Sequence, residues 1–390
     1  MALIQYSLKT IALSLISFIG LIAISLSPGG FWQAPVQALP LTAAPLSLPL
    51  TAAPLPTVVA YLPPGNAITD GQALLRYSLP IDNTEIRKVQ GDLEEISQWL
   101  RSKRWSPIKR NIGKAERVLG RGHDKILADV PEASKAGVET VLDQLQVGLQ
   151  PLRDAVEAKD KEQVWLQRAA LLDLVTVIEE AMVGDFPFEV PVDYSDLPQL
   201  KGRASVEFET TKGTLVAVID GYSAPVTGGN FVDLVQRGFY DGMDFIRAED
   251  NYVLQTGDPA GSDEGFIDPK TGEYRAVPLE ILVQGDEEPV YGDTLESLGR
   301  YLDDPVLPFQ AFGTLGMARP GNDPNGGSSQ FFFFLFEPEL TPAGLNLLDG
   351  RYSVFGYVVD NKEVLDQLGQ GDQILKARVV DGLNNLVQPG

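Results

Sequence analysis

The spacing of apolar residues changes once along the chain, close to residue 204, and this change limits the folds open to it. Before that point apolar residues recur every three or four positions, which predicts amphipathic helices. From Val206 to Thr211 they alternate with polar residues, which predicts β-strands. A chain of 390 residues also exceeds one ordinary core. The sequence therefore predicts a helical domain followed by a separate β domain.

Four helical stripes precede the change of period. Asn83 is positioned to cap the first of these predicted helices at its N-terminus, and Asp160 is positioned to cap the fourth. Gly120 and Gly122 are expected to end the second. Because the connections are short, the economical arrangement is an all-α, up-down four-helix bundle over residues 66–185.

The segment before the bundle has the pattern of an export signal. Residues 11–26 form an apolar run of 16 residues, which fits a signal peptide better than a full membrane span. Val36 and Ala38 are the small residues that a signal peptidase requires at positions −3 and −1. Residues 1–38 are therefore predicted to be a signal peptide cleaved after Ala38, with an uncleaved membrane anchor as the alternative. Residues 39–65 are rich in Pro, Ala and Leu and predict an extended linker. The folded part is expected on the far side of a membrane.

Composition excludes several kinds of chemistry. The chain has no cysteine and one histidine, His123, so disulfides, thiolate nucleophiles and His-cluster metal sites are not expected. Its net charge is −22, and residues 201–390 carry 13 basic against 30 acidic residues. A nucleic-acid-binding protein needs a basic surface, so this class is not expected either. No cofactor or metal is predicted.

The second half of the chain has the pattern of a β domain. Three prolines within residues 185–201 break the helical period, which predicts a linker over residues 186–203 and a domain over residues 204–390. Many short strands with Gly-rich turns and few helices follow. This combination is typical of a closed, mostly-β barrel.

Four segments of the β domain, taken in order, resemble the cyclophilin family of peptidyl-prolyl cis-trans isomerases. They are KGTLVAVIDGYSAPVTGGNFVDLVQRGFYDG, FIRAEDNYVLQTGD, GTLGMARPGNDPNGGSSQFFFFL and LLDGRYSVFGYVV. The resemblance covers about residues 205–385. It implies a cyclophilin-like barrel that isomerises Xaa-Pro bonds without a cofactor.

The resemblance also implies a set of site residues. Arg247 falls at the position of the family's catalytic arginine. A guanidinium there would donate to the prolyl nitrogen, which gains a lone pair as the peptide bond twists out of resonance. The implied substrate-binding positions are Tyr252, Val253, Gln255, Ala318, Arg319, Gln330, Phe332, Leu347, Leu348 and Tyr352.

Several of these positions depart from the family pattern. Tyr252 stands where phenylalanine is usual, Val253 where methionine is common and Arg319 where asparagine is usual. Leu347 replaces a frequent tryptophan and Tyr352 a frequent histidine. The catalytic arginine, the glutamine and the pocket phenylalanine are retained, so we expect the chemistry to be retained with a reshaped pocket.

The order of signal, Pro-rich stretch, helices and acidic β domain resembles the multidomain cyclophilins of the thylakoid lumen and their cyanobacterial relatives. In that family the bundle resembles the small extrinsic four-helix subunit of photosystem II, and the protein is implicated in photosystem II assembly. The resemblance implies a thylakoid lumen or periplasmic location, proline-containing clients, and contact of the bundle with photosystem II subunits or another membrane complex. Two functions remain open at this point. One is an active foldase, and the other is a cyclophilin-shaped binding scaffold with little catalysis.

Overall fold

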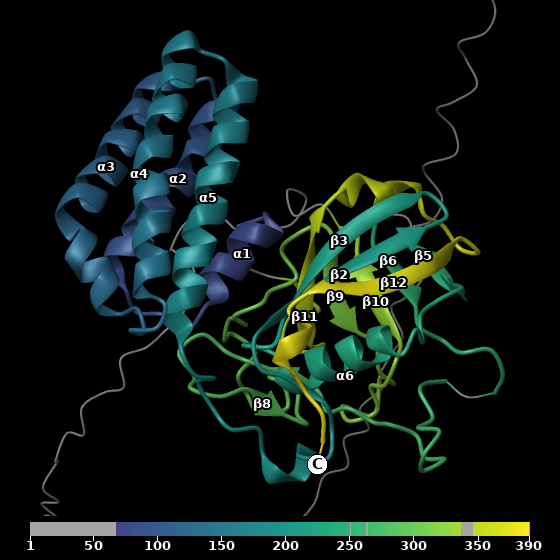
Figure 1. Cartoon of the computed structure of the whole chain (residues 1–390). Helices are drawn as coiled ribbons and strands as arrows, with labels where there is room; N and C mark the ends of the chain where they lie inside the picture. Colours follow the sequence, from purple (N-terminus) through teal and green to yellow (C-terminus); the bar gives the residue numbers. More distant parts are fainter. Residues whose placement is uncertain (1–67, 250, 263, 337–345, 390) are drawn as a thin grey trace, which may run out of the picture. The chain divides into compact units, whose positions relative to one another are not determined.

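The computed structural model of the chain describes residues 68–249, 251–262, 264–336 and 346–389 (Figure 1). The predicted signal peptide and the whole of the predicted Pro-rich linker over residues 39–65 lie outside the described residues. Among the described residues, none of the helices combines the length and the hydropathy of a membrane span.

Within the described part of the chain, five helices precede residue 184. The last four pack in a ring, in which α2 contacts α3 and α5, and α4 contacts the same two helices. Their apolar stripes form one buried cluster, whereas α1 packs against strand β11 of the β region. The helices are α1 (Gly71–Ser78), α2 (Thr84–Arg101), α3 (Trp105–Ala128), α4 (Lys135–Ala158) and α5 (Lys161–Val183).

Capping residues begin two of these helices as the sequence predicts. The Asn83 side chain accepts a hydrogen bond from the N–H of Ile86 at 3.0 Å, and the Asp160 side chain accepts one from Gln163 at 3.1 Å. Each bond satisfies a backbone donor of the first turn that has no partner within the helix.

The expected end of the second stripe at Gly120 and Gly122 is wrong. Helix α3 runs through both glycines to Ala128. Ile126 beyond them is fully buried, so the apolar stripe continues and its burial outweighs the lower helix propensity of glycine. Gly122 is itself buried, and a Cβ there would lie 3.3 Å from the Glu85 side chain.

The β region is built on a nine-stranded antiparallel sheet. Its strand order is β4-β12-β2-β3-β11-β9-β10-β6-β5. Two further pairs, β1 with β13 and β7 with β8, lie outside it, and helix α6 (Pro225–Gln236) packs on β1 and β12. The strands are β1 (Gln199–Leu200), β2 (Arg203–Thr210), β3 (Gly213–Asp220), β4 (Met243–Asp244), β5 (Arg247–Glu249), β6 (Val253–Thr256), β7 (Glu280–Ile281), β8 (Val290–Tyr291), β9 (Thr314–Met317), β10 (Phe331–Phe334), β11 (Val354–Asp360), β12 (Gln373–Asp381) and β13 (Leu386–Val387).

The two end strands of this sheet follow each other directly in the chain. Between β4 and β5, the N–H of Phe245 donates to Asp372 at 2.8 Å and the N–H of Ile246 donates to Gln255 at 2.9 Å. Residues 243–249 therefore run from one end of the sheet to the other. The sheet is curled, and β4 and β5 are not neighbours in its hydrogen-bonded strand order.

Strand β12 was missed in the sequence because its side chains do not alternate regularly. Its pairing with β2 shifts register twice, between Ile374 and Lys376 and between Val379 and Asp381. A bulge adds a residue to one strand and so breaks the period of two on which strand prediction rests.

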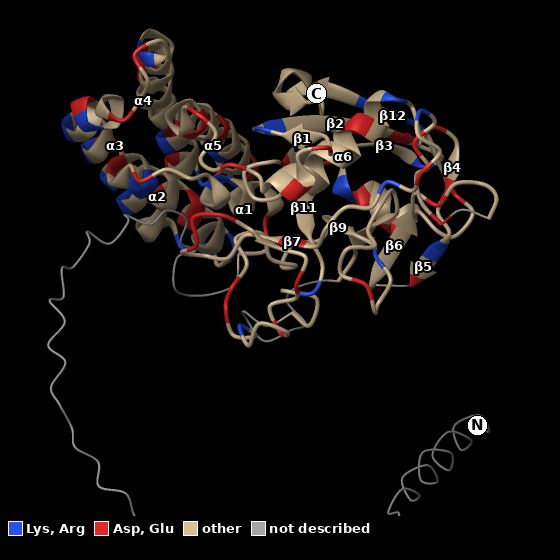
Figure 2. Ribbon diagram, turned by 90° about the horizontal axis from the view of Figure 1, so that it is seen from below, with Lys and Arg blue, Asp and Glu red and all other residues tan. Residues whose placement is uncertain are grey.

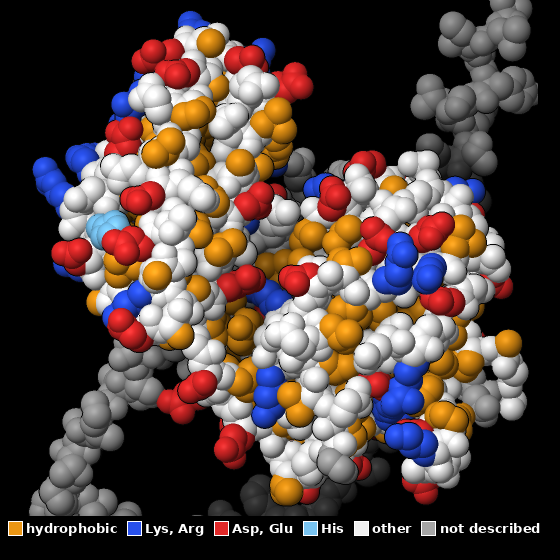
Figure 3. Space-filling model, viewed as in Figure 1, with side chains coloured by type: hydrophobic (Ala, Val, Ile, Leu, Met, Phe, Trp, Pro, Cys, Tyr) orange, Lys and Arg blue, Asp and Glu red, His pale blue; other side chains and the backbone are white. Residues whose placement is uncertain are grey.

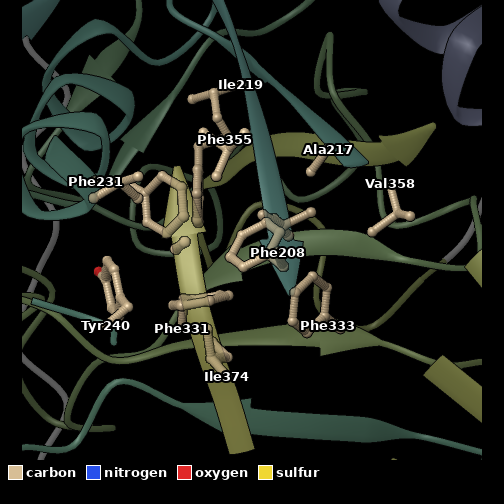
Figure 4. Packing of buried hydrophobic residues seen from close by; sticks show 14 of the residues in the cluster. Phe208, Ala217, Ile219, Phe231, Tyr240, Phe331, Phe333, Phe355, Val358 and Ile374 are labelled. Atoms are coloured by element: carbon tan, nitrogen blue, oxygen red, sulfur yellow. The ribbon is translucent and has the colours of Figure 1, made fainter. Parts of the chain in front are cut away.

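Aromatic side chains fill the inside of the curled sheet (Figure 4). Phe331 and Phe333 of β10 point to this side, and their rings are 5.4 Å apart. Phe208 of β2 and Phe231 of α6 meet them from two other elements at centroid distances of 5.1–6.2 Å. One face of β10 therefore packs in the core, and the opposite face is available for a functional site.

A polar cluster joins the helices to the sheet. The Arg203 guanidinium on β2 pairs with Glu180 of α5 at 2.9 Å and with Asp220 of β3 at 3.3 Å. The Ser78 hydroxyl at the end of α1 donates to the same Asp220 carboxylate at 2.9 Å. Asp220 is fully buried, so these partners supply the compensation that a buried charge needs.

Candidate active site

The register of four strands places the central predicted residues in one row. Arg247 of β5 lies opposite Gln255 of β6, which lies opposite Phe332 of β10. Phe332 in turn lies opposite Gly316 of β9. Directly paired residues on neighbouring strands point to the same face of a sheet, so Arg247, Gln255 and Phe332 share the face opposite the aromatic core.

Two glutamines form a short hydrogen-bonded chain beside this row. The Gln255 Nε2 donates to Gln330 Oε1 at 2.8 Å, and the Gln330 Nε2 donates to Asp258 at 3.0 Å and to the Glu264 carbonyl at 2.9 Å. The side chain of Gln255 is thus fixed by its neighbours. A fixed amide beside the row suits a residue that orients a peptide backbone.

The apolar wall around Phe332 is closely packed. Phe332 is 6% exposed and Val253 is 5% exposed. The ring of Phe309 stacks on Phe332 at 5.8 Å, and Tyr352 meets it edge-on at 5.6 Å. Gly316 makes room for this packing, because a Cβ there would lie 2.5 Å from the Phe332 ring.

The guanidinium of Arg247 is held by a carboxylate on its own strand. Arg247 Nε donates to Glu249 Oε1 at 2.8 Å, and Nη2 donates to the same oxygen at 2.5 Å. Both side chains are about half exposed, at 51% and 47%. The arginine is therefore accessible to a ligand, but two of its donors already have an acceptor.

Arg319 and Ala318 lie at the end of β9 next to the pocket. The Arg319 guanidinium donates to the Arg351 carbonyl at 2.7 and 3.1 Å and lies over the Tyr352 ring at 5.1 Å. The Ala318 N–H donates to the Gln330 carbonyl at 2.9 Å. Arg319 thus supports the loop that carries Tyr352.

The remaining predicted residues lie at the border of the site. Tyr252 is 38% exposed and packs edge-on against Phe334 at 6.0 Å. Leu347 is 84% exposed, whereas Leu348 packs against the cluster that contains Phe332. Leu347 therefore offers an apolar contact to a ligand but has little contact with the protein itself.

Sequence reasoning missed two residues that shape this wall, Phe309 and Asp349. The N–H of Phe309 donates to Asp349 Oδ1 at 2.8 Å, which ties the loop of Leu347 and Leu348 to the ring stacked on Phe332. Desolvation raises the pKa of Asp349 to about 7, although the backbone N–H groups of Phe309 and Asn346 lower it. Phe309 lies in a long acidic segment without a motif, so no local signal pointed to it.

No group of three or more metal-binding side chains occurs among the described residues. The arrangement of a permanently charged donor, a fixed amide and an apolar wall suits chemistry that needs neither a nucleophile nor a metal.

Family comparisons agree with this architecture along most of the chain. Residues 205–384 match the cyclophilin type peptidyl-prolyl cis-trans isomerase/CLD family, and residues 70–183 match the PsbQ-like domain of CYP38-like peptidyl-prolyl cis-trans isomerases. The chain is 54% identical over 356 residues to the Synechocystis sp. protein sll0408, which bears the name of a thylakoid lumen peptidyl-prolyl cis-trans isomerase. That match covers 91% of both chains.

Two Arabidopsis thaliana proteins are also similar. The chloroplastic peptidyl-prolyl cis-trans isomerase CYP38 is 45% identical over 379 residues, covering 94% of this chain and 85% of its own. The chloroplastic isomerase CYP37 is 33% identical over 356 residues, covering 85% of this chain and 73% of its own.

The curled sheet with its arginine row is that of a peptidyl-prolyl cis-trans isomerase. This chain belongs to the cyclophilin type of that enzyme class, in the group that carries a CYP38-like, PsbQ-like helical domain ahead of the isomerase domain.

Proposed function

We propose that the chain isomerises Xaa-Pro bonds of exported proteins, with Arg247 as the catalytic residue. The observation that carries this proposal is the row of Arg247, Gln255 and Phe332 across β5, β6 and β10. The peptide bond has a rotation barrier of about 18–20 kcal/mol because of amide resonance. As the bond twists, the prolyl nitrogen becomes a hydrogen-bond acceptor, and the guanidinium stabilises this state more than either planar state.

The other residues of the row hold the substrate. Gln255 donates to or accepts from the substrate backbone, and Phe332 with Val253 contacts the proline ring. Because these two apolar side chains are almost fully buried, access of the ring requires the Tyr352 side chain to rotate away from Phe332. Tyr252, Leu347 and Leu348 form the outer contacts, and Ala318 with Arg319 and Gln330 lines the substrate backbone.

Arg247→Ala tests this assignment in the full chain. We expect kcat/KM on an Xaa-Pro peptide to fall by about a hundredfold or more, since one donor aimed at a transition state contributes on this order. Arg378→Ala is the matched control. Arg378 lies on strand β12, outside the row, and pairs with Glu207 of β2. Wild-type activity in Arg247→Ala would contradict the role of Arg247. An inactive wild-type chain that still binds the peptide would instead support a binding scaffold.

We also propose where the chain acts and how it is divided. The name of sll0408 supports a thylakoid lumen location, reached by the signal over residues 1–38, and the chloroplastic location in the name of CYP38 agrees with it. The PsbQ-like match supports contact of the helices with photosystem II subunits during assembly. The proposed parts are a linker over 39–65, an up-down four-helix bundle over 66–185, a linker over 186–203 and a barrel over 204–390 that residues 243–249 close. Fractionation of cells should find the chain in the lumen, and recovery from the cytoplasm would contradict this placement.

A further inference from the structure

Helices α2 and α3 enclose a groove on the side away from their common core. Its volume is about 630 Å³. Residues three to four positions apart on each helix line it, so one face of α2 meets one face of α3. The lining consists of Glu85, Lys88, Gly91, Asp92, Lys114, Arg117, Val118, Arg121, Gly122 and Lys125.

This lining is basic in a chain that is strongly acidic. Five of its side chains are cations and two are carboxylates, whereas the chain as a whole has a net charge of −22. Figure 2 shows the basic residues of α2 and α3 in blue, and on the face of the helices seen in Figure 3 acidic and basic side chains are intermixed. The lining of the groove itself has an excess of positive charge.

The carboxylates of the groove are already used by its lysines. Glu85 pairs with Lys88 at 3.2 Å and lies 4.0 Å from Lys125. Asp92 pairs with Lys114 at 3.2 Å. Two arginines remain, and neither has an ion pair with a described carboxylate.

The first of these arginines, Arg117, uses only its Nε, which donates to the Gly113 carbonyl at 2.9 Å. Its terminal nitrogens stay available, as do those of the exposed Arg121 one turn further along α3. Guanidinium groups bind carboxylates through two parallel hydrogen bonds, so two such groups on one face can hold an extended acidic ligand.

Gly91 lines the groove at a position where helix packing does not require a glycine. Gly91 lies in the interior of α2, where glycine is less favourable than alanine by roughly 0.5–1 kcal/mol. A Cβ at Gly91 would meet no atom within 4 Å, so no neighbouring element requires the glycine. The missing side chain leaves room for a ligand backbone to approach the helix.

We propose that this groove binds an extended acidic segment of a partner polypeptide. Charge complementarity points to an anionic ligand, and the composition of the lining fits a polypeptide better than a membrane. A bilayer surface is flat and needs an apolar anchor beside the cations, whereas Val118 is the one apolar side chain of this lining. The inference is independent of the isomerase row and of the proposed catalysis.

Fluorescence anisotropy with the full chain and labelled peptides tests the proposal. The probes are a short peptide of alternating glutamate and glycine and matched peptides with glutamine or lysine in place of glutamate. We expect saturable binding of the glutamate peptide at low ionic strength, with weaker binding at physiological salt, because the charges are exposed. The glutamine and lysine peptides should not bind.

Two double variants test whether the peptide binds in the groove or is held by nonspecific electrostatic attraction. Arg117→Gln with Arg121→Gln should weaken binding by at least about tenfold, since two charge-assisted bonds are lost. Lys109→Gln with Lys161→Gln removes the same charge from exposed positions outside the groove and should leave the affinity within about twofold. Both variants should keep the wild-type isomerase activity.

Gly91→Leu provides a test of shape at constant charge. Its side chain enters open space, so the helical circular-dichroism signal should be unchanged while peptide binding is lost. Equal weakening by the two double variants, or full binding by Gly91→Leu, would overturn the groove as the site. Stronger binding to phosphatidylglycerol vesicles than to the peptide would overturn the polypeptide and favour a membrane.

Discussion

At the scale of single residues, Arg247, the proposed catalytic arginine, is paired with a carboxylate that opposes the proposed role. Glu249 follows Arg247 by two positions on β5, so both side chains lie on the same face. The carboxylate accepts two hydrogen bonds from the guanidinium that would otherwise be directed to the substrate. Under the proposed mechanism, Glu249 therefore competes with the prolyl nitrogen for Arg247.

Glu249→Gln should raise kcat/KM on an Xaa-Pro peptide by about two- to fivefold. An exposed ion pair contributes about 0.2–1 kcal/mol, and removal of the negative charge should lower the activation free energy by this amount. Glu363→Gln removes a charge from an exposed position after β11 and should leave kcat/KM unchanged. A fall in kcat/KM for Glu249→Gln would mean that the carboxylate orients the guanidinium for catalysis.

At the scale of elements, two helix glycines that look alike in the sequence have opposite roles. Gly91 in α2 faces open space, as described above. Gly229 in α6 lies against β1, and a Cβ there would be 2.4 Å from the Pro198 carbonyl and 2.5 Å from the Gln199 Cα. Backbone atoms cannot move aside as a flexible side chain can, so α6 requires glycine at this position.

Alanine at each position should shift stability in opposite directions. Gly91→Ala should stabilise the helical part by about 0.5–1 kcal/mol, because alanine loses less conformational entropy on folding. Gly229→Ala should destabilise the β region by about 1–3 kcal/mol through overpacking. Denaturant unfolding followed by circular dichroism measures both changes, and a stabilised Gly229→Ala would show that β1 does not lie against α6.

At the scale of the whole molecule, buried carboxylates link stability to pH. Burial raises the pKa of Glu179 from 4.5 to about 7, although the Arg87 guanidinium lowers it. Burial also raises the pKa of Glu280 to about 7, against the backbone N–H groups of Thr227 and Val226, which lower it. Both carboxyl groups bind their proton more tightly in the folded chain than in the unfolded one.

The free energy of unfolding should therefore increase as the pH falls from about 8 to about 5. Between the unfolded pKa of 4.5 and the folded pKa of about 7 the folded state holds more protons, so stability decreases as pH rises through this window. Each group contributes on the order of a few kcal/mol, fully present below pH 4.5 and lost above pH 7.

Thermal unfolding of Glu280→Gln across the same pH range checks the origin of this effect. Glutamine does not titrate, so the variant should depend less on pH, while its single amide oxygen keeps an acceptor for one of the two backbone N–H groups at the start of α6. Glu209→Gln, at an exposed position of β2, should keep the wild-type dependence. Wild-type stability that is flat or rises with pH would contradict the prediction.

The sequence alone determined the features that depend on near neighbours in the chain. Stripes of apolar residues placed α2 to α5, the alternation at Val206–Thr211 placed β2, and the motifs around Arg247 and Gln255 identified the family. These signals are strong because helix and strand periods, capping and turn chemistry act over a few residues. Where a bulge broke the period, as in β12, the same method failed.

The tertiary structure decided what depends on residues far apart in the chain. Phe309 stacks on Phe332 from a segment without a motif, and only strand register brings Arg247, Gln255 and Phe332 into one row. The role of a helix glycine was likewise set by whether another element packs on it, as at Gly229, or not, as at Gly91. Such contacts follow from how the elements pack together, and no local spacing of residues encodes them.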